Sequence, residues 1–140
     1  MFARPAKGIP NPSAFEAKLV ALLQVGKKMA LVRYVTEMGM GIDVHGGDYT
    51  KAARRAVSDA IRHSSLNFFR ATDKSPQDMK ITVKLGCADP SAIDRAAVAA
   101  ELPYGTVTVE PEVGGLNVPS DTGSDLMVIV NAAILVCFEE

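Results

Sequence analysis

Four stretches of the chain have the pattern of apolar residues that is typical of β-strands. Residues 28–37, 79–85 and 126–138 are rich in β-branched and other apolar residues, whereas residues 106–113 (TVTVEPEV) alternate strictly between polar and apolar. Pro111 interrupts the alternating stretch, and because proline has no N–H to donate within a sheet, it predicts an edge position or a bulge. The pattern therefore predicts four strands.

Two segments with helical spacing lie between these strands. Asp48 can cap a helix that runs from Tyr49 to about Ser65, and Asp89–Pro90 has the cap-then-proline order that opens a second helix, ending near Glu101. The first helix carries a buried stripe of mostly small residues, which allows a close approach to a sheet. Its members are Ala52, Ala53, Ala56, Val57, Ala60 and Ile61.

The order of these elements predicts an α/β (α+β) fold. It is β-α-β-α-β-β, and crossovers of the usual right hand place both helices on one face of a mixed four-stranded sheet. A further N-terminal helix is predicted from Asn11–Pro12, as cap and first position, to Gly26. We therefore divide the chain into a tail with an accessory helix (1–27) and a single α/β domain (28–140).

The predicted sheet has apolar residues on both faces but helices on only one. The sequences MALVRYV and LMVIVNAAILV place apolar side chains on both sides of their strands. The accessory helix can cover some of the second face, but pairing with identical sheets is the more economical solution. We therefore expect a homo-oligomer.

Composition and charge limit the partners. The 140 residues suit one core, the net charge of -1 favours neither nucleic acid nor an anionic membrane, and aromatic residues are only 6% with no Trp. No run approaches the roughly 20 apolar residues of a membrane span, and the first residues lack a signal-peptide stretch. We expect a cytoplasmic protein, or one of an organelle stroma if a transit peptide precedes this sequence.

A glycine-rich segment, GMGIDVHG (39–46), follows the first strand and precedes a helix. Gly39, Gly41 and Gly46 predict a turn whose backbone N–H groups converge on a ligand. The helix N-terminus adds a positive dipole end, and Lys51, Arg54 or Arg55 add charge, so a small anion would suit this turn. The segment matches neither GxGxxG, whose third glycine would fall at Val44, nor a P-loop.

Asp43 and His45 are the ionisable residues within this segment. Being two apart, they point to the same side of an extended backbone, which suits a metal pair or a carboxylate that orients an imidazole for general base chemistry. The alternative is local capping of turn amides. A metal site lacks ligands, because His63 is the only other histidine, and Cys87 and Cys137 match no metal spacing. We expect no metal and no cofactor.

Two further segments carry candidate catalytic groups. Lys84 ends the apolar strand ITVKLG, where partial burial would lower the pKa of its ammonium and let it activate a nucleophile. The alternative is an edge-strand lysine that reaches solvent. The long loop GGLNVPSDTGSD supplies the hydroxyls of Ser120, Thr122 and Ser124.

The segment GMGIDVHG matches the GxGxDxHG signature of a small family of uncharacterised proteins of bacteria and plants. The resemblance covers Met29 to Phe138 and includes the KAARRAVSDAIRHSSL helix, PYGTVTVE and the terminal VIVNAA strand. It implies no particular activity.

The element order also resembles the fold shared by chorismate mutase and the YjgF-type proteins, which form trimers with sites between subunits. Ring-opening amidohydrolases (cyanuric acid hydrolase and barbiturase) look like three such units fused, each with a lysine–serine pair. Val83–Lys84 resembles the lysine pattern, whereas Ser120-Asp121-Thr122-Gly123 is a poor match to the Ser-Ser-Gly segment. The resemblance implies a homotrimer.

Besides a metal-dependent activity through Asp43 and His45, two hypotheses follow. The first is a hydrolase of a small cyclic amide or related metabolite, with Lys84 as base, Ser120 as nucleophile, and Gly39, Gly41, Asp43, His45, Gly46 and Arg54 as ligand-binding residues. The second is a non-catalytic module that binds a small metabolite or anion on the same trimeric scaffold.

Overall fold

Residues 14–19, 30–64 and 66–140 are described by a computed structural model of the protein. Residues 14–19 are helical, while the residues expected to begin and end the accessory helix lie outside the described ranges. Leu31–Glu139 form one structural unit, separate from the N-terminal segment. All strands and the helices described below belong to this unit.

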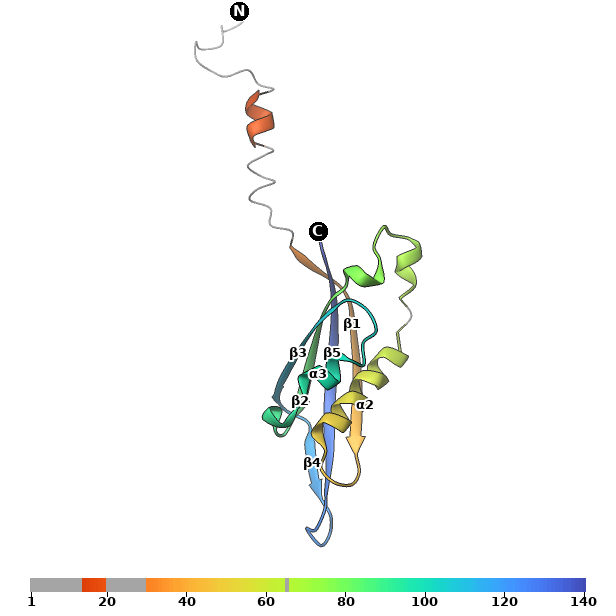
Figure 1. Ribbon diagram of the computed structural model, residues 1–140, viewed down its shortest axis with the longest axis vertical. Helices are drawn as coiled ribbons and strands as arrows, with labels where there is room; N and C mark the ends of the chain where they lie inside the picture. The colour runs from red at the N-terminus through yellow and green to blue at the C-terminus, as the bar shows by residue number, and fades with distance from the viewer. Residues whose placement is uncertain (1–13, 20–29, 65) are drawn as a thin grey trace, which may run out of the picture. The chain divides into compact units, whose positions relative to one another are not determined.

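A mixed sheet is the centre of the unit (Figure 1). Its strands are β1 (Leu31–Asp43), β2 (Lys80–Cys87), β3 (Thr106–Val113), β4 (Leu116–Pro119) and β5 (Leu126–Glu139). The spatial order is β1-β5-β2-β3, and the short β4 pairs with β5 beyond the end of β2. β5 runs antiparallel to β1, β2 and β4, whereas β2 and β3 are parallel. The α/β class with a mixed sheet is confirmed.

The fifth strand lies where the sequence predicts only a loop. Within residues 114–124, β4 pairs Leu116 with Ile129 and Pro119 with Leu126. The chain turns at Gly115, whose φ of 65° is in the left-handed region that glycine tolerates. The Gly- and Pro-rich composition therefore marks the ends of a short strand, which a pattern of only four residues does not reveal. The prediction for Pro111 is confirmed, because β3 pairs only with β2 within the described sheet.

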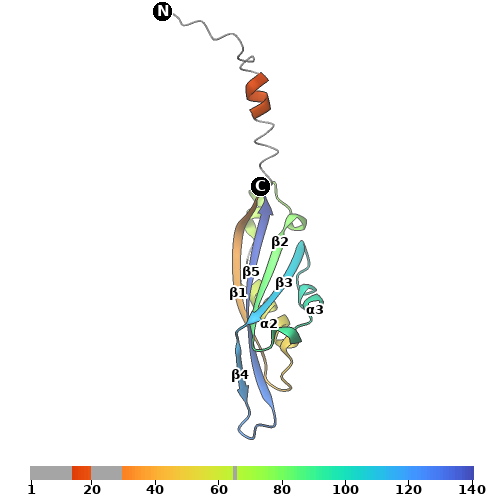
Figure 2. The same ribbon diagram turned by 90° about the vertical axis from the view of Figure 1, so that its left-hand side faces the viewer.

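Both helices cover the same face of the sheet (Figures 1 and 2). α2 (Tyr49–Arg62) begins as predicted at Asp48, whose side chain accepts the N–H of Lys51 at 3.0 Å. α3 (Arg95–Ala99) is shorter than predicted. Asp89 instead caps a single 3-10 turn, Pro90–Ala92, and Asp94 then caps the helix, so two capping residues divide the segment.

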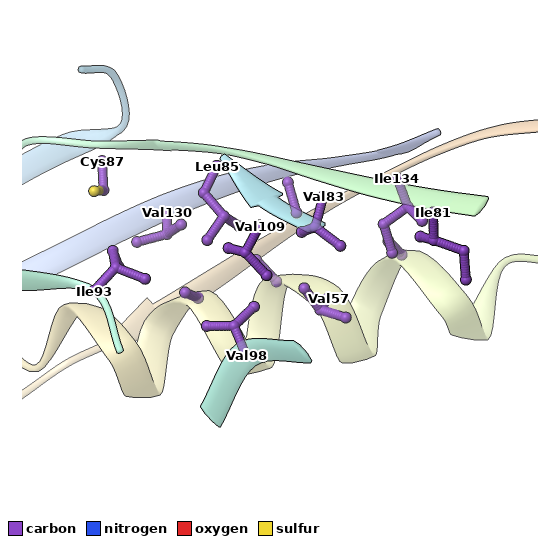
Figure 3. Close-up of a cluster of buried hydrophobic side chains, with 14 of the residues drawn as sticks. Val57, Ile81, Val83, Leu85, Cys87, Ile93, Val98, Val109, Val130 and Ile134 are labelled. Atoms are coloured by element: carbon purple, nitrogen blue, oxygen red, sulfur yellow. The ribbon is translucent and has the colours of Figure 1, made fainter. Parts of the chain in front are cut away.

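The core lies between the sheet and α2, with Val98 of α3 closing one side (Figure 3). Side chains of β5 alternate, and every second one from Val128 to Phe138 is buried on the helix-covered face. The predicted stripe of α2 packs against them: Ala52, Ala53, Ala56, Val57 and Ala60 are fully buried, and Ile61 is half-buried. Cys87 is buried in this core, whereas Cys137 faces the other side of the sheet and is half-buried.

Gly39 and Gly41 lie in β1 and not in a turn, which corrects the interpretation of the glycine-rich segment. Neither has a positive φ. A Cβ on Gly39 would overlap the carbonyl oxygen of Ala56, and one on Gly41 would overlap that of Ala52. These glycines therefore allow α2 to contact the strand backbone, and only residues 44–48 form the turn.

The second face of the sheet, here called the open face, is covered by no helix among the described residues of the Leu31–Glu139 unit. Its side chains alternate with those of the core along each strand. Apolar residues gather where β1, β4 and β5 meet, and several are largely exposed: Met38 (71%), Met40 (49%), Leu116 (55%) and Val118 (36%). No helix among the described residues is long and apolar enough to cross a membrane.

Candidate functional site

The turn between β1 and α2 contacts the residue that precedes β5. Nδ1 of His45 lies 2.7 Å from Oδ2 of Asp125, 80 positions along the chain. The His45 side chain is 84% exposed, while that of Asp125 is 33% exposed. The pair exists because β1 ends beside the start of β5, with Asp43 opposite Val128.

Asp125 is held by backbone amides as well as by the histidine. Its Oδ1 accepts the N–H of Gly46 at 2.9 Å and that of Leu126 at 2.8 Å. The Gly46 N–H, the His45 ring and the Leu126 N–H together lower the pKa of this carboxyl to about 2. Asp125 is therefore ionised at neutral pH and fixes the orientation of the imidazole.

Gly46 is the residue that lets the turn reach Asp125. Its φ of 96° is disfavoured for residues with a Cβ, and Gly47 follows with a φ of 60°. The Gly47 N–H then donates to the carbonyl of Leu126 at 3.1 Å. The N–H groups of Gly46 and Gly47 thus donate to a carboxylate and a carbonyl of the protein itself, and their predicted convergence on a ligand stays a prediction.

A hollow of about 170 Å³ lies beside the pair. His45 and Asp125 line it together with Ser120 and with apolar side chains of β4 and β5, among them Val118 and Met127. The Ser120 hydroxyl accepts the N–H of Asp125 at 3.1 Å. The loop hydroxyls are linked further, since Thr122 Oγ1 lies 2.7 Å from Ser124 Oγ. The structure thus joins two predicted residues, His45 and Ser120, through Asp125.

Asp43 lies on the other side of the turn and does not orient His45. Its carboxylate is buried, accepts the N–H of Asp48 at 2.9 Å, and is 3.4 Å from Nζ of Lys51. The Asp48 amide is the main cause that lowers the pKa of Asp43, against the opposing effect of burial. The predicted Asp43–His45 pair is wrong, because the strand ends at Asp43 and the backbone turns before His45. An internal carboxylate thus occupies the helix N-terminus expected to bind an anion.

Arg54 lies away from the turn. Its Nε donates to Oε1 of Glu101 at 2.6 Å and so connects α2 to the end of the α3 segment. Arg55 is the arginine near the turn, where its guanidinium donates to the carbonyl of Ile42 at 2.6 Å. Arg54 and Arg55 face different neighbours because consecutive helical residues differ by about 100° in direction.

Lys84 lies on the open face of β2, a central strand. Its ammonium is 3.7 Å from a carboxylate oxygen of Glu110 and 4.0 Å from one of Glu112. It pairs in register with Ala133 of β5, whereas Pro119, next to Ser120, pairs with Leu126. Ala133 and Leu126 are seven positions apart, roughly 23 Å along a strand. The structure therefore does not bring Lys84 and Ser120 together within one chain.

No group of three or more His, Cys, Asp or Glu side chains with metal-binding geometry occurs among the described residues. The residue missed by the sequence interpretation is Asp125, which lies at the end of the loop GGLNVPSDTGSD. Its position immediately before an apolar strand is a signal for a carboxylate at a strand end, but nothing local connects it with His45.

The fold and the site define an α+β protein with a helix-covered mixed sheet and a histidine–aspartate pair at the turn after the first strand. The chain belongs to the Lin0512 family of conserved hypothetical proteins, whose family model matches residues 33–136.

The chain is similar to a protein from Nostoc punctiforme PCC 73102 that is described as FtsZ-like and of unknown function. The two share 38% sequence identity with a TM-score of 0.72, over 80% of this chain and 99% of the other. No curated protein has a significantly similar sequence. The family is therefore established, and the resemblance to ring-opening amidohydrolases stays a prediction.

Proposed function

We propose that this protein is a small-molecule enzyme of hydrolase type whose active site is the hollow beside His45 and Asp125. The observation that carries the proposal is the 2.7 Å contact between the imidazole and a carboxylate whose pKa is lowered to about 2. An ionised partner at Nδ1 favours the tautomer in which Nε2 is free to accept a proton. Nε2 has no hydrogen-bond partner among the described residues.

Ser120 is the proposed nucleophile. It lines the same hollow as His45, and its hydroxyl oxygen accepts the N–H of Asp125. In the proposed reaction, the hydroxyl oxygen attacks the carbonyl carbon of a cyclic amide while its proton passes to Nε2 of His45. The ring C–N bond then breaks as the nitrogen takes that proton, and water hydrolyses the resulting ester and restores the serine. The volume of the hollow suits a small ring.

An oligomer interface is part of the proposal. Val118 and Met127 belong to the open face and also line the hollow, so a second copy packed on that face would border the site. Lys84 lies on the same face. A lysine–serine pair therefore requires contact between copies, with a homotrimer as the expected assembly.

The test is hydrolysis of a panel of small cyclic imides and ureides, such as succinimide and hydantoin. We expect His45→Ala, Asp125→Asn and Ser120→Ala to lower kcat/KM on the substrate found by about 10²–10⁴-fold, the usual contribution of general base or nucleophile. His63→Ala is the matched control, because His63 forms the other histidine–aspartate pair, with Asp59 at 3.2 Å, outside the hollow.

Lys84→Ala distinguishes a His45–Ser120 dyad from a Lys84–Ser120 dyad. If Lys84→Ala and Ser120→Ala lose turnover while His45→Ala keeps it, the base is Lys84 and not His45. Full turnover in the His45 and Ser120 variants contradicts the proposed site.

The alternative function is a non-catalytic module that binds a small metabolite at the same hollow. It is favoured by the exposure of His45, which leaves the imidazole in contact with solvent. In that case His45→Ala abolishes ligand-induced thermal stabilisation, while neither wild type nor any variant consumes the ligand.

A further inference from the structure

A second hollow, of about 180 Å³, opens on the helix-covered face near the C-terminal end of α2. Its floor is formed by apolar residues of two neighbouring strands, Ile81 of β2 and Ile134 and Val136 of β5, together with Met79, which precedes β2. Ile61 of α2 and Leu102 form walls. Figure 3 shows Ile81 and Ile134 side by side at one end of the core, away from Cys87 and Ile93. The lining is almost entirely apolar.

One charged group borders this apolar surface. Glu37 lies directly opposite Ile134 in the β1–β5 register, so its side chain is on the helix-covered face. It is half-buried, and its carboxylate forms no hydrogen bond or ion pair with any described residue. A carboxylate that borders an apolar hollow and has no partner among the described residues is available to pair with a bound cation.

Tyr104 adds an aromatic ring to the same lining. It follows Pro103 after α3 and is 52% exposed. Aromatic faces attract ammonium groups, as carboxylates do. We propose that this hollow binds a small molecule that has an apolar body and an ammonium group, with the body on Ile81, Ile134 and Val136 and the ammonium at Glu37.

The volume sets the size of the ligand. A cavity of about 150 Å³ holds one benzene molecule, so this hollow accommodates a single ring with a short substituent. The site is independent of the proposed hydrolase site. Ile134 is eight positions along β5 from Leu126, which lines the hollow beside His45.

The test is titration of the ¹⁵N-labelled full-length protein with benzylammonium, followed by amide chemical shifts. Benzyl alcohol, which has the same ring without the charge, is the matched ligand. We expect shifts at Ile61, Ile81 and Ile134, tighter binding of benzylammonium than of benzyl alcohol, and about tenfold weaker benzylammonium binding in Glu37→Gln.

Two further variants complete the design. Glu139→Gln removes an exposed carboxylate of β5 outside the hollow and should leave binding unchanged. Tyr104→Ala should weaken benzylammonium more than benzyl alcohol, and because Tyr104 is exposed, this variant is expected to fold. Equal affinity for both ligands, unchanged affinity in Glu37→Gln, or no shifts around the hollow would overturn the proposal.

Discussion

Two carboxylates hold the turn between β1 and α2. Asp43 accepts the N–H of Asp48, and Asp125 accepts that of Gly46. Both have lowered pKa values, chiefly because these backbone amides stabilise the ionised form. Only Asp125 also contacts the imidazole of His45. The two carboxylates therefore have different roles: Asp43 holds the start of α2, and Asp125 orients His45.

We predict that the contribution of Asp125 to stability depends on pH. The pKa in the folded protein, about 2, is below the usual 3.8, so the stabilisation is complete above about pH 4 and is lost as the pH falls towards 2. The difference in Tm between wild type and Asp125→Asn should therefore be largest above pH 4 and should narrow between pH 4 and pH 2. Thermal unfolding followed by circular dichroism measures it.

The control for this prediction is Asp121→Asn, in the same loop. Asp121 forms no hydrogen bond or ion pair with the described residues, so its replacement should change Tm little at any pH. A difference for Asp125→Asn that stays constant down to pH 2 would show that the carboxylate is not held as described.

At the scale of elements, α2 is joined to β1 by more than apolar packing. β1 is an edge strand, and its outward backbone groups find partners on the helix. The N–H of Met40 donates to Asp59 at 3.0 Å, and the carbonyl of Ile42 accepts from Arg55 at 2.6 Å. These bonds occupy groups that would otherwise be free to pair with another strand. They form because Gly39 and Gly41 let the helix lie against the strand backbone.

We predict that Gly41→Ala destabilises the protein by roughly 1–3 kcal/mol or more, because the added methyl group would overlap the helix backbone. Gly86→Ala is the matched control. Gly86 also lies in a strand, but a Cβ there would have its nearest neighbour at an ordinary 3.5 Å. The control should change the free energy of unfolding by less than about 1 kcal/mol. Urea denaturation measures both, and equal effects would contradict the close approach.

At the scale of the whole molecule, the unit from Leu31 to Glu139 has two unlike faces. One is covered by α2 and α3, and the other exposes methionine, leucine and valine side chains beside the ion pairs of Lys84. Exposed apolar patches of this kind mark interaction surfaces. The open face also reaches the hollow beside His45 through Val118 and Met127, so assembly and the proposed site are connected.

We predict that Met38→Glu and Met40→Glu abolish self-association. Both side chains lie on the open face, where a buried unpaired carboxylate would strongly disfavour an interface. Val113→Glu is the control, because Val113 is 82% exposed but lies on the other side of its strand from Glu110 and Glu112. Sedimentation velocity should show an oligomer for wild type and for the control, and a monomer for the two variants. A monomeric wild type would contradict the prediction.

The segment GMGIDVHG and the helix after it differ in how far local sequence predicts their structure. The beginning of α2 at Asp48 and its alanine stripe are confirmed, because capping and helical spacing are local properties. The predicted turn position of Gly39 and Gly41 is wrong. Glycine suits both turns and close packing, and the sequence does not distinguish these uses. The sequence also does not predict the division of residues 89–101 into a 3-10 turn and a short helix, because Asp89 and Asp94 are equally suited to cap a helix.

The amino-acid pattern alone predicts the α/β class and the start of α2, because hydrophobic periodicity and capping act over a few residues. Three relations appear only in the folded chain: His45 contacts Asp125, the Asp43 carboxylate is buried and accepts the Asp48 N–H, and Lys84 lies far from Ser120 along β5. These relations depend on the register of strands that are distant in sequence. Register is set by packing the whole sheet against α2, which no local pattern encodes.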